Sequence, residues 1–170
     1  MSILYLVVAL VALLRLVELV RASRNTRALM AKGAIEVGRG QYRAIVAFHA
    51  LWLLALVAFI PADAPPDWFW LGFFVLLNAA RLWVIASLGP YWTTRIVDLP
   101  GAPLVKRGPY RFLRHPNYLV VALEIPVLPL AFGAWRLALG FGLVNLALLG
   151  WRVALEDRAL AARRNIAARS

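Results

Sequence analysis

The sequence predicts an all-α, polytopic membrane protein with about five transmembrane helices and a cytoplasmic C-terminal helix. Hydrophobic residues make up 63% of the 170-residue chain, whereas a soluble domain has roughly 45–50% apolar residues. These residues gather in five runs, most of which reach the ~17–25 residues that a helix needs to cross the bilayer core. The runs are 3–20, 44–60, 68–88, 118–132 and 135–155.

The last two runs predict the shape of the C-terminal half. The fourth run is short and contains Pro126 and Pro129, which favour a kinked helix or a tight pair with the fifth helix across residues 133–134. Residues 156–169 alternate alanine, leucine and isoleucine with arginine, a pattern typical of a short amphipathic helix along the membrane surface. Since the polar loops are too short to form a second domain, we expect residues 1–170 to form one domain.

The formal net charge of +11 follows the ends of the predicted helices. Residues 21–43 hold six lysines and arginines, residues 61–67 hold none, residues 89–116 hold five, and the tail after Asp157 holds four. A nucleic-acid-binding surface would gather its cations on one soluble face, so we expect no nucleic-acid partner. By the positive-inside rule the N-terminus lies outside and the C-terminus in the cytoplasm, as in a bacterial-type inner membrane.

The residue types present also limit the chemistry. The chain has no cysteine and two histidines, so a thiolate site is excluded and a zinc centre would need an unusual set of carboxylates. We therefore expect no metal. No Gly-x-Gly-x-x-Gly follows a predicted strand, and the glycines of residues 33–38 lack the Lys-Ser/Thr of a phosphate-binding loop.

Four polar residues inside the predicted helices lie at a similar depth, roughly 9–12 Å from the cytoplasmic ends at ~1.5 Å per helical residue. They are His49, Arg81, Glu124 and Asn145. Charged residues within a membrane mark functional sites by default, which makes Glu124, His49 and Arg81 candidate catalytic residues around a cavity open to the cytoplasm. Arg81 and Glu124 could equally neutralise each other, and His49 could be a structural donor. Arg15 and Glu18 can pair on the first helix.

The most specialised segment is residues 106–124, where a polar loop joins the fourth helix. Gly108-Pro109-Tyr110-Arg111, then Arg114-His115-Pro116-x-Tyr118, and later Arg152-x-x-x-Glu156-Asp157 resemble the isoprenylcysteine carboxyl methyltransferase family of integral membrane enzymes. The resemblance covers about residues 104–160. Asp157 departs from the family, which usually has a glutamate there, and its carboxylate has a shorter reach.

This resemblance implies an S-adenosyl-L-methionine pocket formed by the loop before the fourth helix, the last two helices and the tail. No Rossmann domain would be involved. The cofactor-binding residues at the matching positions would be Lys106, Gly108, Pro109, Tyr110, His115, Tyr118 and Glu156. The expected activity is transfer of a methyl group to a carboxylate or hydroxyl of a lipophilic acceptor, with membrane lipids around the enzyme.

The N-terminal half is similar to a bacterial subgroup associated with polyketide synthases that make alkylpyrones and alkylresorcinols. The similarity rests on Arg15-x-x-Glu18, Ser23-Arg24-Asn25, Lys32-Gly33-Ala34-x-Glu36-x-Gly38, Tyr42 and His49. It implies a lipid-tailed phenol or enol as the acceptor in place of a prenylated protein. Two alternatives stay open, namely a phospholipid amine methyltransferase and a non-catalytic membrane module that binds haem through His49 and His115.

Overall fold

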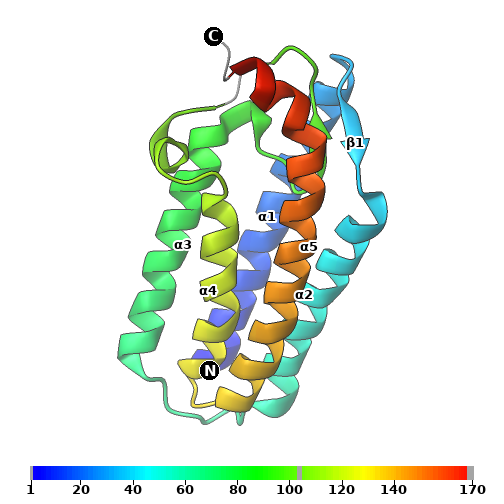
Figure 1. Ribbon diagram of the computed structural model, residues 1–170. Coiled ribbons are helices and arrows are strands. Elements are labelled where there is room, and N and C mark those ends of the chain that lie inside the picture. The colour runs from blue at the N-terminus through cyan, green and yellow to red at the C-terminus, as the bar shows by residue number, and fades with distance from the viewer. Residues whose placement is uncertain (1, 103–104, 168–170) are drawn as a thin grey trace.

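The computed structural model describes residues 2–102 and 105–167, which form a bundle of five helices. The helices are α1 (Ile3–Met30), α2 (Arg39–Phe59), α3 (Trp68–Leu88), α4 (Pro116–Leu130) and α5 (Trp135–Ala167). The all-α prediction with about five spans is confirmed. Four of the helices are long and apolar enough to cross a membrane, and α4, with 15 residues, is shorter. In Figure 1 α1 begins at one end of the bundle and α5 ends at the other.

The helices α1 and α5 are longer than their apolar runs. The apolar run that begins α1 stops near Val20, but the helix continues to Met30 because residues 21–30 contain no glycine or proline to end it. It ends just before Gly33, which has a positive φ of 88°. The predicted C-terminal helix exists as the last part of α5, which runs on unbroken to Ala167.

The short helix α4 is the most enclosed part of the bundle, packed against α3 and α5. Val120, Val121, Ile125 and Leu128 join the main core. Pro126 and Pro129 both lie inside the helix. Prolines within a membrane helix are tolerated where neighbouring groups satisfy the carbonyls they leave without partners.

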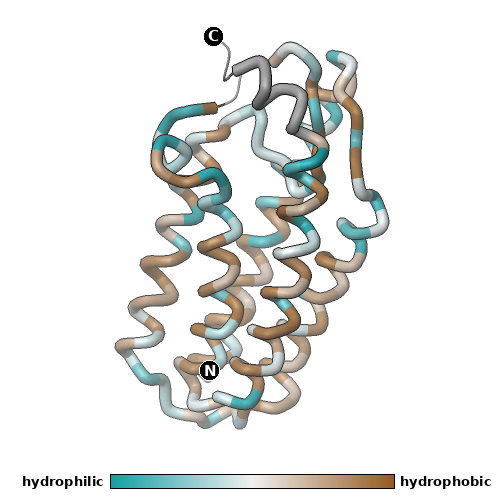
Figure 2. Tube along the Cα trace, viewed as in Figure 1, coloured by the Kyte–Doolittle hydropathy of each residue, from teal (hydrophilic) through white to brown (hydrophobic). Residues whose placement is uncertain are grey.

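The end of the bundle where α1 and α3 finish and α2 and α4 begin carries the long polar loops 31–38 and 89–115. We call it the loop-rich end, and Figure 2 shows polar segments gathered there, above helices that are mainly hydrophobic. Two short strands, β1 (Ile35–Val37) and β2 (Ile96–Asp98), pair antiparallel with Val37 opposite Ile96. No pattern in the sequence predicts this pairing. Arg95 supports it by pairing with Glu36 at 2.9 Å.

The 3-10 helices η1 (Gly89–Tyr91) and η2 (Gly108–Arg111) complete the loop-rich end. Asn25 of α1 donates to the carbonyls of Gly89 at 3.1 Å and Trp92 at 2.8 Å. These bonds fix the end of α1 beside η1. The start of the loop that leads to α4 is thereby held on the ends of α1 and α3.

Candidate active site

Five polar side chains from the start of α4 and the second half of α5 meet at the loop-rich end, and we call them the α4–α5 cluster. They are His115, Tyr118, Arg152, Glu156 and Asp157. The hydroxyl of Tyr118 donates to Glu156 and accepts from Nε of Arg152 at 2.9 Å. The rings of His115 and Tyr118 stack with centroids 5.3 Å apart and an angle of 11° between their planes.

The local sequence accounts for this meeting. Pro116 begins α4, a position that proline favours because its missing N–H has no helical partner there. His115 immediately precedes the helix, and Tyr118 follows within its first turn. Arg152 and Glu156 are four residues apart and therefore lie on one face of α5. The antiparallel packing of α4 and α5 then brings the two pairs together.

His115 faces two carboxylates through its two ring nitrogens. Nε2 lies 3.2 Å from Oδ1 of Asp157, and Nδ1 lies 3.7 Å from Oε1 of Glu156. Both nitrogens are thus directed at protein oxygens, which argues against His115 as an axial haem ligand. Asp157, despite its shorter side chain, reaches His115.

The loop residues proposed for the cofactor lie next to this cluster. Gly108 has a positive φ of 57°, and a Cβ on it would lie 2.1 Å from Oγ of Ser87 on α3, so only glycine fits this close approach. Pro109 is buried, whereas Lys106 is exposed. Burial and the nearby Glu156 carboxylate raise the pKa of Tyr110, so this phenol stays protonated.

Three polar side chains near the loop-rich end have buried atoms without a hydrogen-bond partner among the described residues. They are Thr26, Gln41 and Asn117. Gln41 is the most marked case, because it is 1% exposed and both its amide nitrogen and its amide oxygen are unpartnered. Such a group costs free energy unless a water or a ligand satisfies it.

Gln41 can be placed along the bundle from two contacts between α2 and α5. Phe48 contacts Phe141, with ring centroids 5.6 Å apart, and a Cβ on Gly38 would lie 3.3 Å from Leu155. Because the two helices are antiparallel, Gln41 falls between these contacts, close to the level of Arg152. It also shares the buried stripe of α2 with Phe48 and Trp52. The unpartnered amide therefore lies inside the bundle at the level of the α4–α5 cluster.

Deeper in the bundle, two arginines and two glutamates form a closed ring of ion pairs that we call the intramembrane ring. Its members are Arg15 and Glu18 of α1, Arg81 of α3 and Glu124 of α4. Arg15 pairs with Glu18 at 2.8 Å and with Glu124 at 3.0 Å. Arg81 pairs with Glu18 at 2.8 Å and with Glu124 at 3.2 Å. The ring has no net charge and joins three helices.

The ring changes the interpretation of the polar layer. The expected pairs Arg81–Glu124 and Arg15–Glu18 are present, but their closure into one ring was not predicted. Each carboxylate accepts hydrogen bonds from two guanidinium groups. Both oxygens of Glu124 are therefore engaged, Oε1 by Arg15 and Oε2 by Arg81. The sequence signal for the ring is the presence of four charges within apolar runs.

The other two members of the predicted layer make separate contacts. Asn145 donates to the carbonyl of Val121 at 3.1 Å and so ties α5 to α4. Nδ1 of His49 lies 2.9 Å from the carbonyl of Ile45. Because a carbonyl can only accept, Nδ1 carries the proton, and Nε2 of His49 keeps a lone pair. The lone pair on Nε2 of His49 is thus able to accept a hydrogen bond.

No group of three or more metal-binding side chains occurs among residues 2–102 and 105–167.

The fold and the polar interior of the bundle define an integral membrane protein. The chain belongs to the isoprenylcysteine carboxyl methyltransferase (ICMT) family, whose model matches residues 70–162. This membership supports methyltransferase activity at the membrane.

Two relatives share most of the chain. The uncharacterized protein YpbQ of Bacillus subtilis (strain 168) is 37% identical over 161 residues, which cover 92% of this chain and 95% of the relative. An uncharacterized protein of Haemophilus influenzae is 29% identical over 144 residues, covering 81% of this chain and 83% of the relative. No solved structure matches. The family is therefore established, whereas the acceptor is not named by these relatives.

Proposed function

We propose that this protein transfers a methyl group from S-adenosyl-L-methionine to an oxygen of a lipophilic acceptor within the membrane. The observation that carries the proposal is the α4–α5 cluster, in which the hydroxyl of Tyr118 joins Arg152 to Glu156 beside the ring of His115. These residues belong to the segment that matches the ICMT family model.

The charges and rings of the cluster suit the proposed cofactor. Glu156 would face its positive groups, Arg152 would face its carboxylate, and the aromatic faces of His115 and Tyr118 would pack against its sulfonium or base. The backbone from Lys106 to Tyr110, including Gly108 and Pro109, would hold the polar end. The unpartnered amide of Gln41 at the same level is the kind of group that a ligand would satisfy. When bound, the cofactor supplies a methyl group already activated on sulfur.

The protein's own task is then to orient the acceptor and exclude water. Glu124 lies six residues beyond Tyr118 on α4, about 9 Å deeper at ~1.5 Å per residue. Arg81 and Glu124 would orient the polar head of the acceptor beside the intramembrane ring. Nε2 of His49 would take the proton of a phenol or enol. A carboxylate acceptor would need no base.

The orientation of the chain is part of this proposal. A cytoplasmic methyl donor requires the loop-rich end to face the cytoplasm, with the N-terminus outside. The cation-rich segments 21–43 and 89–116 lie at that end, as the positive-inside rule requires. The acceptor would enter from the bilayer, between helices.

The test is methyl transfer by the purified protein in lipid nanodiscs with radiolabelled S-adenosyl-L-methionine. Acceptors are an alkylresorcinol, a long-chain alkyl hydroxypyrone, a farnesylcysteine analogue and phosphatidylethanolamine. We expect label in one of the three oxygen acceptors, and mild base distinguishes a methyl ester, which releases labelled methanol, from an ether, which does not. Transfer to the phospholipid amine alone would contradict O-methylation. His115→Ala and Glu156→Ala should abolish transfer and weaken S-adenosylhomocysteine binding, whereas the exposed Arg111→Gln should keep both.

A further inference from the structure

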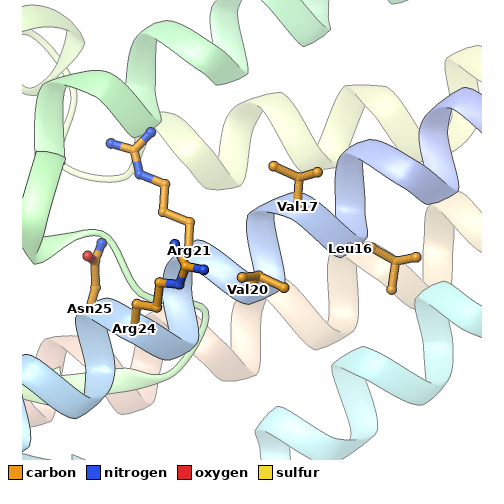
Figure 3. Close-up of a pocket in the computed structure, with 6 residues that line it drawn as sticks. All are labelled: Leu16, Val17, Val20, Arg21, Arg24 and Asn25. Carbon is orange, nitrogen blue, oxygen red and sulfur yellow. The ribbon is translucent and has the colours of Figure 1, made fainter.

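A groove of about 460 Å³ runs along α1 near the loop-rich end. Its lining residues are Leu16, Val17, Val20, Arg21, Arg24 and Asn25. Figure 3 shows Arg21 and Arg24 at one end of this stretch of α1 and Leu16 and Val17 at the other. Aliphatic side chains therefore lie toward the middle of the bundle, and the cations follow one to two turns nearer to its end.

The two arginines of the groove, Arg21 and Arg24, differ from Arg15 on the same helix. Arg21 and Arg24 are exposed and make no ion pair or hydrogen bond with any described residue. By contrast, Arg15, less than two turns away on the same helix, pairs with Glu18 and Glu124. The intramembrane ring is neutral, so it leaves no carboxylate to compensate the charge of the groove. Among the described residues, therefore, no carboxylate pairs with Arg21 or Arg24, and their positive charge faces the surroundings of the protein.

The groove also has a fixed polar end. Asn25 holds α1 against Gly89 and Trp92 through two side-chain hydrogen bonds, so Arg24 and Arg21 project from a helix that is anchored just beyond them. From Val17 to Arg24 the rise is about 10 Å at ~1.5 Å per residue. This spacing matches a ligand with an anionic group at the membrane surface and an apolar tail below it.

We propose that this groove binds a phospholipid with an anionic headgroup, from the leaflet at the loop-rich end. The phosphate would lie between Arg21 and Arg24, and an acyl chain would cover Leu16, Val17 and Val20. Basic side chains at a membrane surface attract anionic lipids, and here two of them share a groove with an apolar floor. The site is separate from the α4–α5 cluster, because all its lining residues come from α1.

Native mass spectrometry tests the proposal on protein released from mixed micelles of phosphatidylglycerol and phosphatidylcholine in equal amounts. We expect the protein to retain phosphatidylglycerol preferentially, and Arg21→Gln/Arg24→Gln to lower that preference about tenfold or more. The matched control is Arg27→Gln/Lys32→Gln, which removes the same charge from exposed residues outside the groove. It should change the preference by less than about twofold.

Glycerol 3-phosphate provides the headgroup chemistry without acyl chains. It should not displace the retained lipid at millimolar concentration, because it cannot cover the aliphatic part of the groove. An equal loss of preference in the two double variants would show diffuse charge attraction and overturn the proposal. So would a wild-type protein that retains both lipids equally, a groove variant that keeps the wild-type preference, or displacement by glycerol 3-phosphate.

Discussion

The indole of Trp52 on α2 donates a hydrogen bond of 3.2 Å to the carbonyl of Ile125 on α4. This is the carbonyl that would accept from residue 129 in a regular helix, and Pro129 has no N–H to donate. Both Trp52 and Ile125 are buried. A side chain of one helix thus replaces the backbone bond that a proline removes from another, and α4 keeps its two internal prolines without an unsatisfied carbonyl at this position.

Trp52→Phe should therefore destabilise the protein more than its loss of volume requires. The buried carbonyl of Ile125 would lose its partner, at a cost of about 1–3 kcal/mol. Pro129→Ala restores a backbone donor, so the same Trp52→Phe substitution should cost about 1–3 kcal/mol less in that background. Pro126→Ala is the control, since Pro126 frees the carbonyl of Ala122 instead. Unfolding in mixed micelles measures all five variants with the wild type, and equal costs in the three backgrounds would contradict the replacement.

Gly108 offers a test of how the loop before α4 is shaped. Gly108→Ala should weaken S-adenosylhomocysteine binding at least about tenfold, because its Cβ would meet Oγ of Ser87 at 2.1 Å and shift the loop. Gly33→Ala is the control, because Gly33 also has a positive φ but nothing within 4 Å. Calorimetry should show nearly wild-type affinity for this control. Adding Ser87→Gly removes the obstructing atoms and should recover much of the loss, which no general effect of alanine would explain.

How far the sequence predicts this protein depends on the kind of feature. Apolar runs predict the helices because their length matches the bilayer, and the depth of a polar residue follows from its position along a helix. The direction in which that residue points around the bundle does not follow from its position along the helix. The approach of Arg81 and Glu124 could be predicted from their depth, but the closed ring with Arg15 and Glu18 depends on how three helices are rotated against one another.

The features that could not be predicted arise from contacts distant in the chain. The strands β1 and β2 have three residues each and pair across about 60 residues, so no local pattern marks them. The inward position of Gln41 can be predicted from its spacing, since it precedes Phe48 by seven residues and so lies on the same face of α2. The grouping of His115, Tyr118 and Glu156 was expected only from the family resemblance.

Substitutions at Glu124 can distinguish its structural contribution to the intramembrane ring from a catalytic one. Glu124→Gln leaves one net positive charge in the ring and should destabilise the protein by about 3–5 kcal/mol. Arg15→Gln/Glu124→Gln restores neutrality and should recover much of that stability. If Glu124 contacts the acceptor, turnover should stay low in both variants while S-adenosylhomocysteine affinity changes little. Recovery of turnover together with stability in the double variant would make Glu124 a structural residue alone.

The orientation of the bundle can be tested by labelling, because the native chain has no cysteine. Asp63→Cys, in the loop between α2 and α3, and Arg111→Cys, in η2, place single thiols at exposed positions. The α2–α3 loop and η2 lie at opposite ends of the bundle. An impermeant thiol reagent added to intact cells should label Cys at position 63 and not at position 111. Opened cells, in which both should react, are the control. The reverse pattern would place the α4–α5 cluster outside, away from a cytoplasmic methyl donor.

Gln41 leads to a prediction in which stability and binding change in opposite directions. Gln41→Leu should stabilise the ligand-free protein by about 1–3 kcal/mol, because it removes a buried amide whose two polar atoms have no partner among the described residues. It should also reduce the stabilisation that S-adenosylhomocysteine gives, since a ligand that binds more weakly raises the unfolding midpoint less.

Asn145→Leu is the matched control: Asn145 is 2% exposed and therefore buried, like Gln41, but its amide is bonded to the carbonyl of Val121. That variant should lose stability and keep its response to the ligand. If Gln41→Leu instead destabilises the ligand-free protein as Asn145→Leu does, Gln41 has a partner of its own and does not contribute to the cofactor site.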